Sequence, residues 1–186
     1  QGSALAEPTL AEHFQTSRAP IREALIALER EGLVQFEKTG RTRVRSFSGS
    51  ELKEIMEARA AIEGMAARLA NRLWTKEDTA VLEKNIAAQE RARDLAELSR
   101  LDIDLHHHVV TRGGNASLVR LWEPLRWQWE THLVEIYRRQ RGDAFVPEKE
   151  TIRAHKHLLK ALAEGTPAEA SEAMMNQILF NLRWAK

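Results

Sequence analysis

The side chains best suited to chemistry in this sequence stand in one run, LDIDLHHH, at residues 101–108. Two Asp/His pairs in this run are spaced by four residues, which places each pair on one face of a helix. Asp102 and His106 share their face with leucines and a valine, whereas Asp104 and His108 share theirs with charged residues. We therefore expect the first pair to point into the protein interior and the second pair to face water.

Two later segments supply further polar side chains that point inward. His155 falls in an apolar stripe with isoleucine and leucine, whereas His157 falls on the charged face of the same segment. Gln177 shares its face with an alanine and a methionine. Helical phase therefore directs His155 and Gln177 toward the same interior as Asp102 and His106.

Burying Asp102 requires a partner for its charge. An unpaired buried carboxylate costs several kcal/mol of desolvation unless it is hydrogen-bonded or binds a cation. Two inward histidines supply that partner, and imidazole and carboxylate ligands together suit Zn²⁺, Ni²⁺ or similar metals. The spacing leaves two interpretations open: a divalent metal bound by Asp102, His106 and His155, or a buried Asp–His hydrogen bond without a metal.

The part of the chain that must position these residues is helical throughout. No convincing strand pattern follows Ser48, and Gly113–Gly114, Gly142 and Gly165 are typical of helix ends. The expected helices span residues 50–74, 75–93, 94–112, 116–140, 147–164 and 167–184. Six helices in a segment of this length predict a compact bundle.

The first 47 residues have a different pattern. A short helix begins near Leu10, Ser17 can cap a second helix over Ala19–Glu31, and two short alternating segments flank the turn Thr39–Gly40. This order is helix, turn, helix and hairpin. The sequence thus predicts a mainly α protein, with a winged helix-turn-helix domain over residues 1–47 followed by an all-α six-helix bundle over residues 48–186.

Basic residues gather where such a domain meets DNA. The second helix of a helix-turn-helix enters the major groove with its N-terminal residues nearest the bases, and here these include Arg18 and Arg22, one turn apart. The expected wing carries Lys38, Arg41, Arg43 and Arg45 against a single acidic residue, Glu37. Spacing alone leaves DNA binding and an ordinary solvated α+β segment equally open.

The composition excludes chemistry based on cysteine and argues against a membrane protein. The 186 residues carry a net charge of +1 and no cysteine, which removes disulfides, thiolate metal sites and cysteine nucleophiles and fits a reducing cytoplasm. No apolar run approaches the ~20 residues that cross a bilayer, and no signal-peptide pattern is visible, so we expect no membrane partner. The first residue is not Met, which leaves the natural N-terminus open.

One long motif carries a family resemblance. The segment LAEHFQTSRAPIREALIALEREGLV, at residues 10–34, resembles the DNA-binding helices of the GntR family of bacterial repressors. The resemblance implies that Arg18, Arg22 and the wing-tip Gly40 contact DNA, and we include the adjacent Ser17 and Arg41 in the expected surface. The family normally has another helix before Leu5, which this sequence lacks.

The second domain carries a resemblance of its own. Residues 48–186 resemble the FCD ligand-binding domain of the FadR subfamily, through EARAAIEGMAARLA, DIDLHHHVVTRGGN and AHKHLLKALAEGTPAEA. The resemblance implies that Asp102, His106 and His155 are metal ligands. A further family histidine corresponds to Gln177, whose amide oxygen is a weaker ligand, so a metal-free pocket is the alternative.

The same resemblance implies an effector site. In such domains an arginine helps the metal to bind a carboxylate, and Arg59 matches the family's E-x-R-x-x-x-E pattern. We expect Arg59 and Gln177 to contact the effector, although Arg59 could instead form a salt bridge with Glu63, one turn on.

These resemblances predict a homodimeric repressor that binds a pseudo-palindromic double-stranded DNA operator and a small organic acid, with Zn or Ni as a possible cofactor. A metal-dependent enzyme and a metal-sensing regulator are the alternatives. Against an enzyme, the sequence has no HExxH motif, no paired Glu-x-x-His motifs and no Gly-rich phosphate loop.

Overall fold

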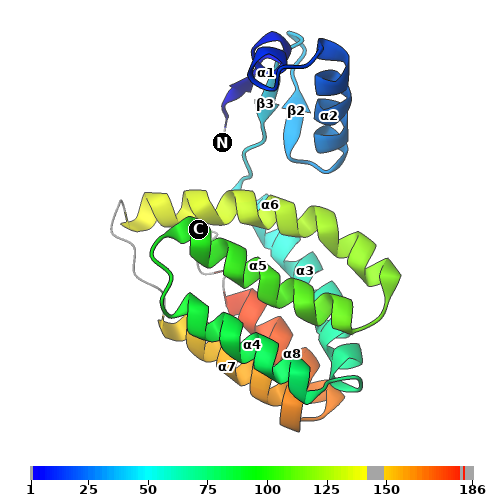
Figure 1. Cartoon of the computed structure of the whole chain (residues 1–186), viewed down its shortest axis with the longest axis vertical. Coiled ribbons are helices and arrows are strands. Elements are labelled where there is room, and N and C mark those ends of the chain that lie inside the picture. The colour runs from blue at the N-terminus through cyan, green and yellow to red at the C-terminus, as the bar shows by residue number, and fades with distance from the viewer. Residues whose placement is uncertain (1, 142–148, 181, 183–186) are drawn as a thin grey trace. The chain divides into compact units, whose positions relative to one another are not determined.

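The computed structural model of the chain describes the backbone of residues 2–141, 149–180 and 182, with side chains outside residues 131–141 (Figure 1). The side chain of His132 and the expected helix end at Gly142 lie outside these described parts. The chain divides into two compact units, residues 1–48 and residues 49–186. Each unit has its own fold.

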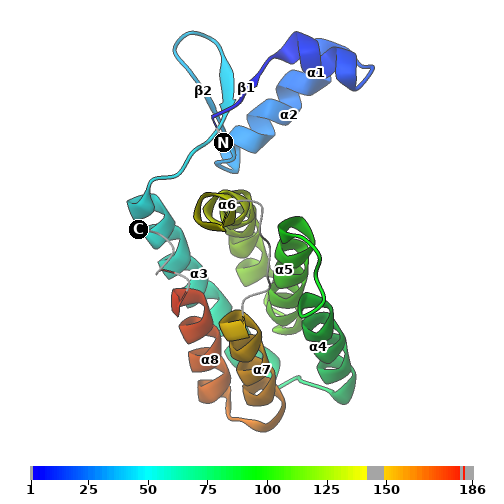
Figure 2. The same ribbon diagram turned by 90° about the vertical axis from the view of Figure 1, so that its left-hand side faces the viewer.

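The first unit is the expected winged helix-turn-helix. Its elements are β1 (Ala4–Leu5), α1 (Glu7–His13), α2 (Arg18–Arg30), β2 (Val34–Phe36) and β3 (Thr42–Val44) (Figures 1 and 2). The three strands form an antiparallel sheet in the order β1-β3-β2, with Val34 opposite Val44. The first strand was not predicted, because two residues are too few to show an alternating pattern.

Two turns of this unit have a clear physical basis. The wing turns at Gly40, whose φ of +79° lies in the left-handed region that glycine adopts without steric cost. Ser17 occupies the N-cap position of α2 as expected, but its side chain makes no capping hydrogen bond. The prediction that Ser17 caps the helix is therefore correct in placing Ser17 at the N-cap position and wrong in expecting its side chain to bond to the helix.

The second unit is a bundle that contains all six expected helices. They are α3 (Gly49–Asn71), α4 (Lys76–Gln89), α5 (Leu95–Arg112), α6 (Ala116–Arg141), α7 (Lys149–Glu164) and α8 (Pro167–Phe180). Thr75 and Asp78 form a reciprocal capping box at the start of α4, and Asn115 accepts hydrogen bonds from backbone amides at the start of α6. Among the described helices, none has the length and hydropathy to cross a membrane.

Helix α3 packs against α5, α6, α7 and α8 (Figures 1 and 2). It buries a series of alanines, which allow neighbouring helices to approach closely, and Gly64 adjoins Met175 of α8. The core on α6 includes Trp122 and Trp129, both buried, while Trp127 is 38% exposed. This arrangement places one face each of α3, α5, α7 and α8 around a shared interior.

We predict that Gly113→Ala, at the end of α5, lowers the free energy of unfolding by about 1–3 kcal/mol. A Cβ at Gly113 would lie 2.8 Å from the backbone carbonyl oxygen of Ala66, which cannot move without shifting α3. The matched variant is Gly64→Ala, where the new Cβ would meet the half-exposed, flexible side chain of Met175. Urea denaturation that finds the Gly64 variant the less stable of the two would contradict this account of the packing.

Candidate metal and effector site

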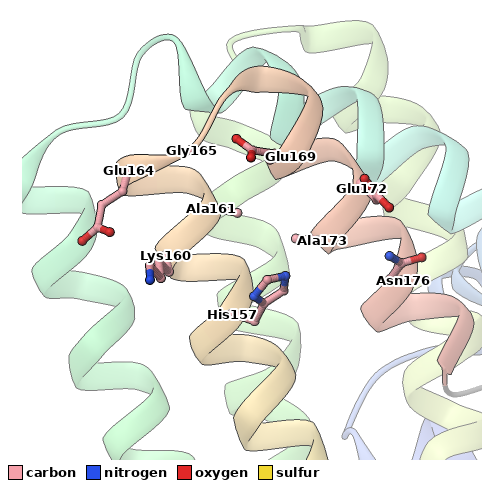
Figure 3. A pocket seen from close by; sticks show the side chains of 9 residues that line it. All are labelled: His157, Lys160, Ala161, Glu164, Gly165, Glu169, Glu172, Ala173 and Asn176. Atoms are coloured by element: carbon pink, nitrogen blue, oxygen red, sulfur yellow. The ribbon is translucent and has the colours of Figure 1, made fainter.

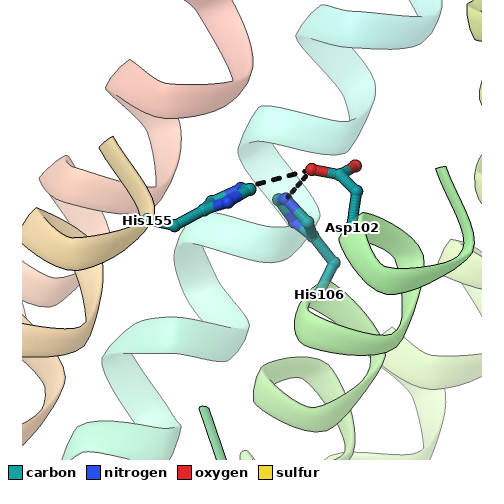
Figure 4. Close-up of side chains that lie close together, drawn as sticks. All are labelled: Asp102, His106 and His155. Atoms are coloured by element: carbon teal, nitrogen blue, oxygen red, sulfur yellow. Dashed lines mark ion pairs between the residues drawn. The ribbon is translucent and has the colours of Figure 1, made fainter. Parts of the chain in front are cut away.

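Three of the predicted residues meet inside the bundle. Asp102 and His106 of α5 and His155 of α7 are buried and point toward one another (Figure 4). The Nε2 atom of His155 lies 3.2 Å from Asp102 Oδ1, and the Nε2 atom of His106 lies 4.0 Å from the same oxygen. One ligand atom from each of the three residues lies within 4.8 Å of the others, which is a spacing that one metal ion can span.

His106 is oriented by a second carboxylate that sequence reasoning did not place in the cluster. Its Nδ1 atom makes a short contact with Oε2 of Glu63 on α3. The other carboxylate oxygen of Glu63 accepts a hydrogen bond from Arg59 Nε at 2.7 Å. A proton on His106 Nδ1 therefore faces Glu63, and this leaves Nε2 directed at Asp102.

Both ring nitrogens of His155 also have partners. Nδ1 lies 2.9 Å from Oε1 of Gln89 on α4, and Nε2 lies 3.1 Å from Nε2 of Gln177 on α8. The side-chain oxygen of Gln177 is buried and has no hydrogen-bond partner among the described residues. Gln177 thus lies at the cluster, as helical phase predicts, and one of its polar atoms has unmet hydrogen-bonding capacity.

The two buried carboxylates are held in their charged forms. Burial raises the pKa of Glu63, but the charges of Arg59 and His106 and the hydrogen bonds from both outweigh this effect and lower the pKa to about 2. Burial likewise raises the pKa of Asp102, and the hydrogen bond with His155 and the charges of His106, His155 and Arg59 bring it to about 2. Glu63 and Asp102 are therefore both negatively charged at neutral pH, and Glu63 is paired with the buried Arg59.

The donor set fits a divalent cation. Asp102 Oδ1 and the Nε2 atoms of two imidazoles converge on one point, and when both rings are neutral these three atoms are all lone-pair donors. Such an arrangement needs a positive charge at its centre, either a proton on one ring or a metal ion. The buried amide oxygen of Gln177 is a further oxygen atom of the kind that a cation can recruit.

Arg59 forms the salt bridge with Glu63 and is 1% exposed. Only its Nε atom is used in that pair, and the guanidinium carbon lies 5.5 Å from the centre of the Trp129 ring. The salt bridge and an effector contact are therefore compatible, because they use different edges of the guanidinium group.

The second Asp/His pair differs from its prediction. Asp104 is exposed, as expected, but His108 does not share its environment. The Nε2 atom of His108 lies 2.9 Å from Asp78 on α4, and Asp78 also accepts a hydrogen bond from Arg112. The His108 side chain is 27% exposed, so the prediction that it faces water is only partly correct. Helical phase gives a direction and cannot show that another helix packs there.

A hollow of about 480 Å³ lies along the outside of α7 and α8 (Figure 3). His157 lines it and is exposed, as its helical phase predicts. An adjoining hollow of about 360 Å³ shares His157 and Asn176 and reaches Gln177. The outer surface of these two helices thus comes close to the buried cluster at Gln177.

Three of the five expected DNA-contacting residues lie together in the first unit. Arg22, Gly40 and Arg41 line a single groove of about 600 Å³. Ser17 and Arg18 are exposed at the start of α2. Arg43 is instead engaged in the wing, where it binds Glu37 and the carbonyl oxygen of Gly2.

Comparison with known proteins defines the class. Residues 1–44 match the family described as bacterial regulatory proteins, gntR family, and residues 54–179 match the FCD domain. The chain belongs to the GntR family of transcription regulators and carries an FCD domain. This is a family of regulators, so the enzyme alternative is wrong.

Individual relatives agree with this family. The chain is 29% identical over 179 residues to a probable D-xylose utilization operon repressor of Paenarthrobacter nicotinovorans, covering 95% of this chain and 76% of that protein. It is 25% identical over 164 residues to the gluconate operon repressor of Bacillus licheniformis, covering 87% and 67%. Among solved structures, E. coli McbR/YncC shares the fold, with a TM-score of 0.85 at 23% identity, over 99% of this chain and 87% of that one.

We predict that Glu63→Gln lowers the free energy of unfolding at pH 7 by about 3–5 kcal/mol, because it leaves a buried guanidinium uncompensated. Folding lowers the pKa of Glu63 from 4.5 to about 2, so its contribution is present above pH 4.5 and is lost as the pH falls toward 2. Urea denaturation across this range should show the two proteins converging.

The matched control is Glu57→Gln on the same helix. Glu57 pairs with Lys53 at the same four-residue spacing, but the pair is exposed, with 3.7 Å between the charged atoms. An exposed pair of this kind contributes less than about 1 kcal/mol. Equal losses in the two variants would show that burial of the Arg59–Glu63 pair has no particular importance.

Proposed function

We propose that the chain is a transcriptional repressor whose affinity for its operator is controlled by a small carboxylate bound in the FCD bundle. The observation that carries this proposal is the buried cluster of Asp102, His106 and His155 beside Arg59. If the role of the bundle were only structural, this many buried polar groups would add little to its stability. Their convergence on one point supports a ligand site.

The first unit supplies the DNA contacts in this proposal. Arg22 and Arg41 line one groove with Gly40, where the absence of a side chain permits a close approach of the backbone to DNA. Arg18 and Arg22 face the major groove from the start of α2, with Ser17 at the phosphates. Two copies in a homodimer would read the halves of a pseudo-palindromic operator, in the cytoplasm.

The second unit supplies the effector site. Asp102, His106 and His155 would hold a divalent ion such as Zn²⁺ or Ni²⁺, with Gln177 beside them, and the ion would supply a positive charge that binds an anionic ligand. Arg59 contributes its Nη edge to the effector carboxylate. One relative is named as the repressor of a gluconate operon. Gluconate is a hydroxycarboxylate, which agrees with the proposed class of ligand.

We predict that Arg22→Ala weakens operator binding and reduces the salt dependence of the affinity, because one contact with a phosphate or base is lost. The matched control is Arg30→Ala, in the last turn of the same helix and exposed. Fluorescence anisotropy on an operator duplex at several salt concentrations measures both effects. If the Arg30 variant loses as much affinity as the Arg22 variant, the start of α2 does not read DNA.

For the effector site, we predict about one equivalent of divalent metal per chain, measured by elemental mass spectrometry on protein purified without chelator or nickel resin. His155→Ala should lose this metal and the response of operator binding to small carboxylates, while DNA binding itself persists. His157→Ala, on the exposed face of the same helix, serves as the control. Wild-type protein without metal would eliminate the metal from this proposal and leave Arg59 as the carboxylate's partner.

A further inference from the structure

We infer that Asn85 and Gln89 on α4 are positioning residues that hold the proton of His155 on Nδ1, so that Nε2 is presented to Asp102 and to whatever binds there. Neither residue belongs to the predicted site. Gln89 is fully buried, and both side chains lie in one hydrogen-bonded series that ends at His155. The orientation of every group in this series follows from its first member.

The series starts at a backbone carbonyl, which can only accept. Asn85 Nδ2 donates to the carbonyl oxygen of Leu101 at 3.0 Å, which fixes the orientation of the Asn85 amide. Asn85 Oδ1 then accepts from Gln89 Nε2 at 2.7 Å. This in turn fixes the Gln89 amide, so the atom that Gln89 directs at His155 is its oxygen.

The ring of His155 must donate to that oxygen. Gln89 Oε1 lies 2.9 Å from His155 Nδ1, and an amide oxygen has no proton to give, so Nδ1 carries the hydrogen. Nε2 can donate to Asp102 only when the ring carries a second proton; in the neutral ring the lone pair is on Nε2. Gln177 Nε2, at 3.1 Å, can donate to that lone pair, and this leaves Gln177 Oε1 without a partner among the described residues.

Without this series the proton would have a better position on the other nitrogen. Asp102 Oδ1 lies 3.2 Å from His155 Nε2, and a carboxylate is a stronger acceptor than an amide. A proton on Nε2 would block the one ring atom that faces the cluster. The two amides of α4 therefore hold the proton of His155 on Nδ1, as Glu63 does for His106. Unlike Glu63, they add no negative charge beside the carboxylates of Glu63 and Asp102.

The test is to read the proton positions directly in the full-length protein by ¹⁵N NMR of the histidine rings, since the shift of each ring nitrogen reports whether it is protonated. In the wild type we expect His155 Nδ1 to be protonated. In Gln89→Leu the proton should move to Nε2. In Gln89→Glu, which restores an acceptor, it should return to Nδ1.

Two results would overturn the inference: a wild-type ring protonated on Nε2 alone, or a Leu variant with the wild-type pattern. The wild-type spectrum decides the first point even if the Leu variant fails to fold. Asn176→Leu, which removes an exposed amide from α8, should leave the pattern unchanged.

The consequence for binding rests on the proposed function and is measured separately. Zn²⁺ titration should show about 10–100-fold weaker binding in Gln89→Leu than in the wild type, the usual effect of losing a group that orients a metal-ligating histidine. Affinity should recover in Gln89→Glu. A wild type that binds no zinc yet has the expected proton positions would reject the metal in the proposed function and leave the positioning role intact.

Discussion

The interior of the helical bundle depends on one constraint, which is that the buried negative charge of Glu63 must be compensated. This carboxylate has no exposed surface, and it is charged because a guanidinium and an imidazole lie against its two oxygens. The pairing sets the direction of Arg59 along α3 and turns the free nitrogen of His106 toward Asp102. Removing the charge of Glu63 would therefore disturb the cluster of Asp102, His106 and His155 as well as helix α3, which carries Glu63.

Helical phase was sufficient to predict most of the fold and the inward members of the site. Asp102, His106, His155 and Gln177 were predicted because apolar residues surround them at helical spacing in the sequence. Phase could not give the partners, since it says which way a side chain points and nothing about which helix it meets. For this reason the contacts of His106 with Glu63, of His155 with Gln89 and of His108 with Asp78 became visible only in the structure.

The two units differ in how much core they possess. The described core of the first unit is a small group around Ala11, Ile21 and Leu25, whereas that of the second extends over all six helices. A small core gives a small margin of stability, because less apolar surface is removed from water. The second unit is therefore the part of the chain that is best able to hold the fixed internal geometry that the proposed ligand site requires.

The hydrogen-bonded series from Leu101 to His155 has a consequence for how this sequence can change over generations. Each amide in the series is oriented by the group before it. A replacement that exchanges donor and acceptor at one position therefore requires the next group to exchange them as well. A single mutation at residue 85 or residue 89 thus creates a mismatch that a second mutation must repair. Substitutions at these two positions should therefore be tolerated mainly in pairs that restore the order of donors and acceptors.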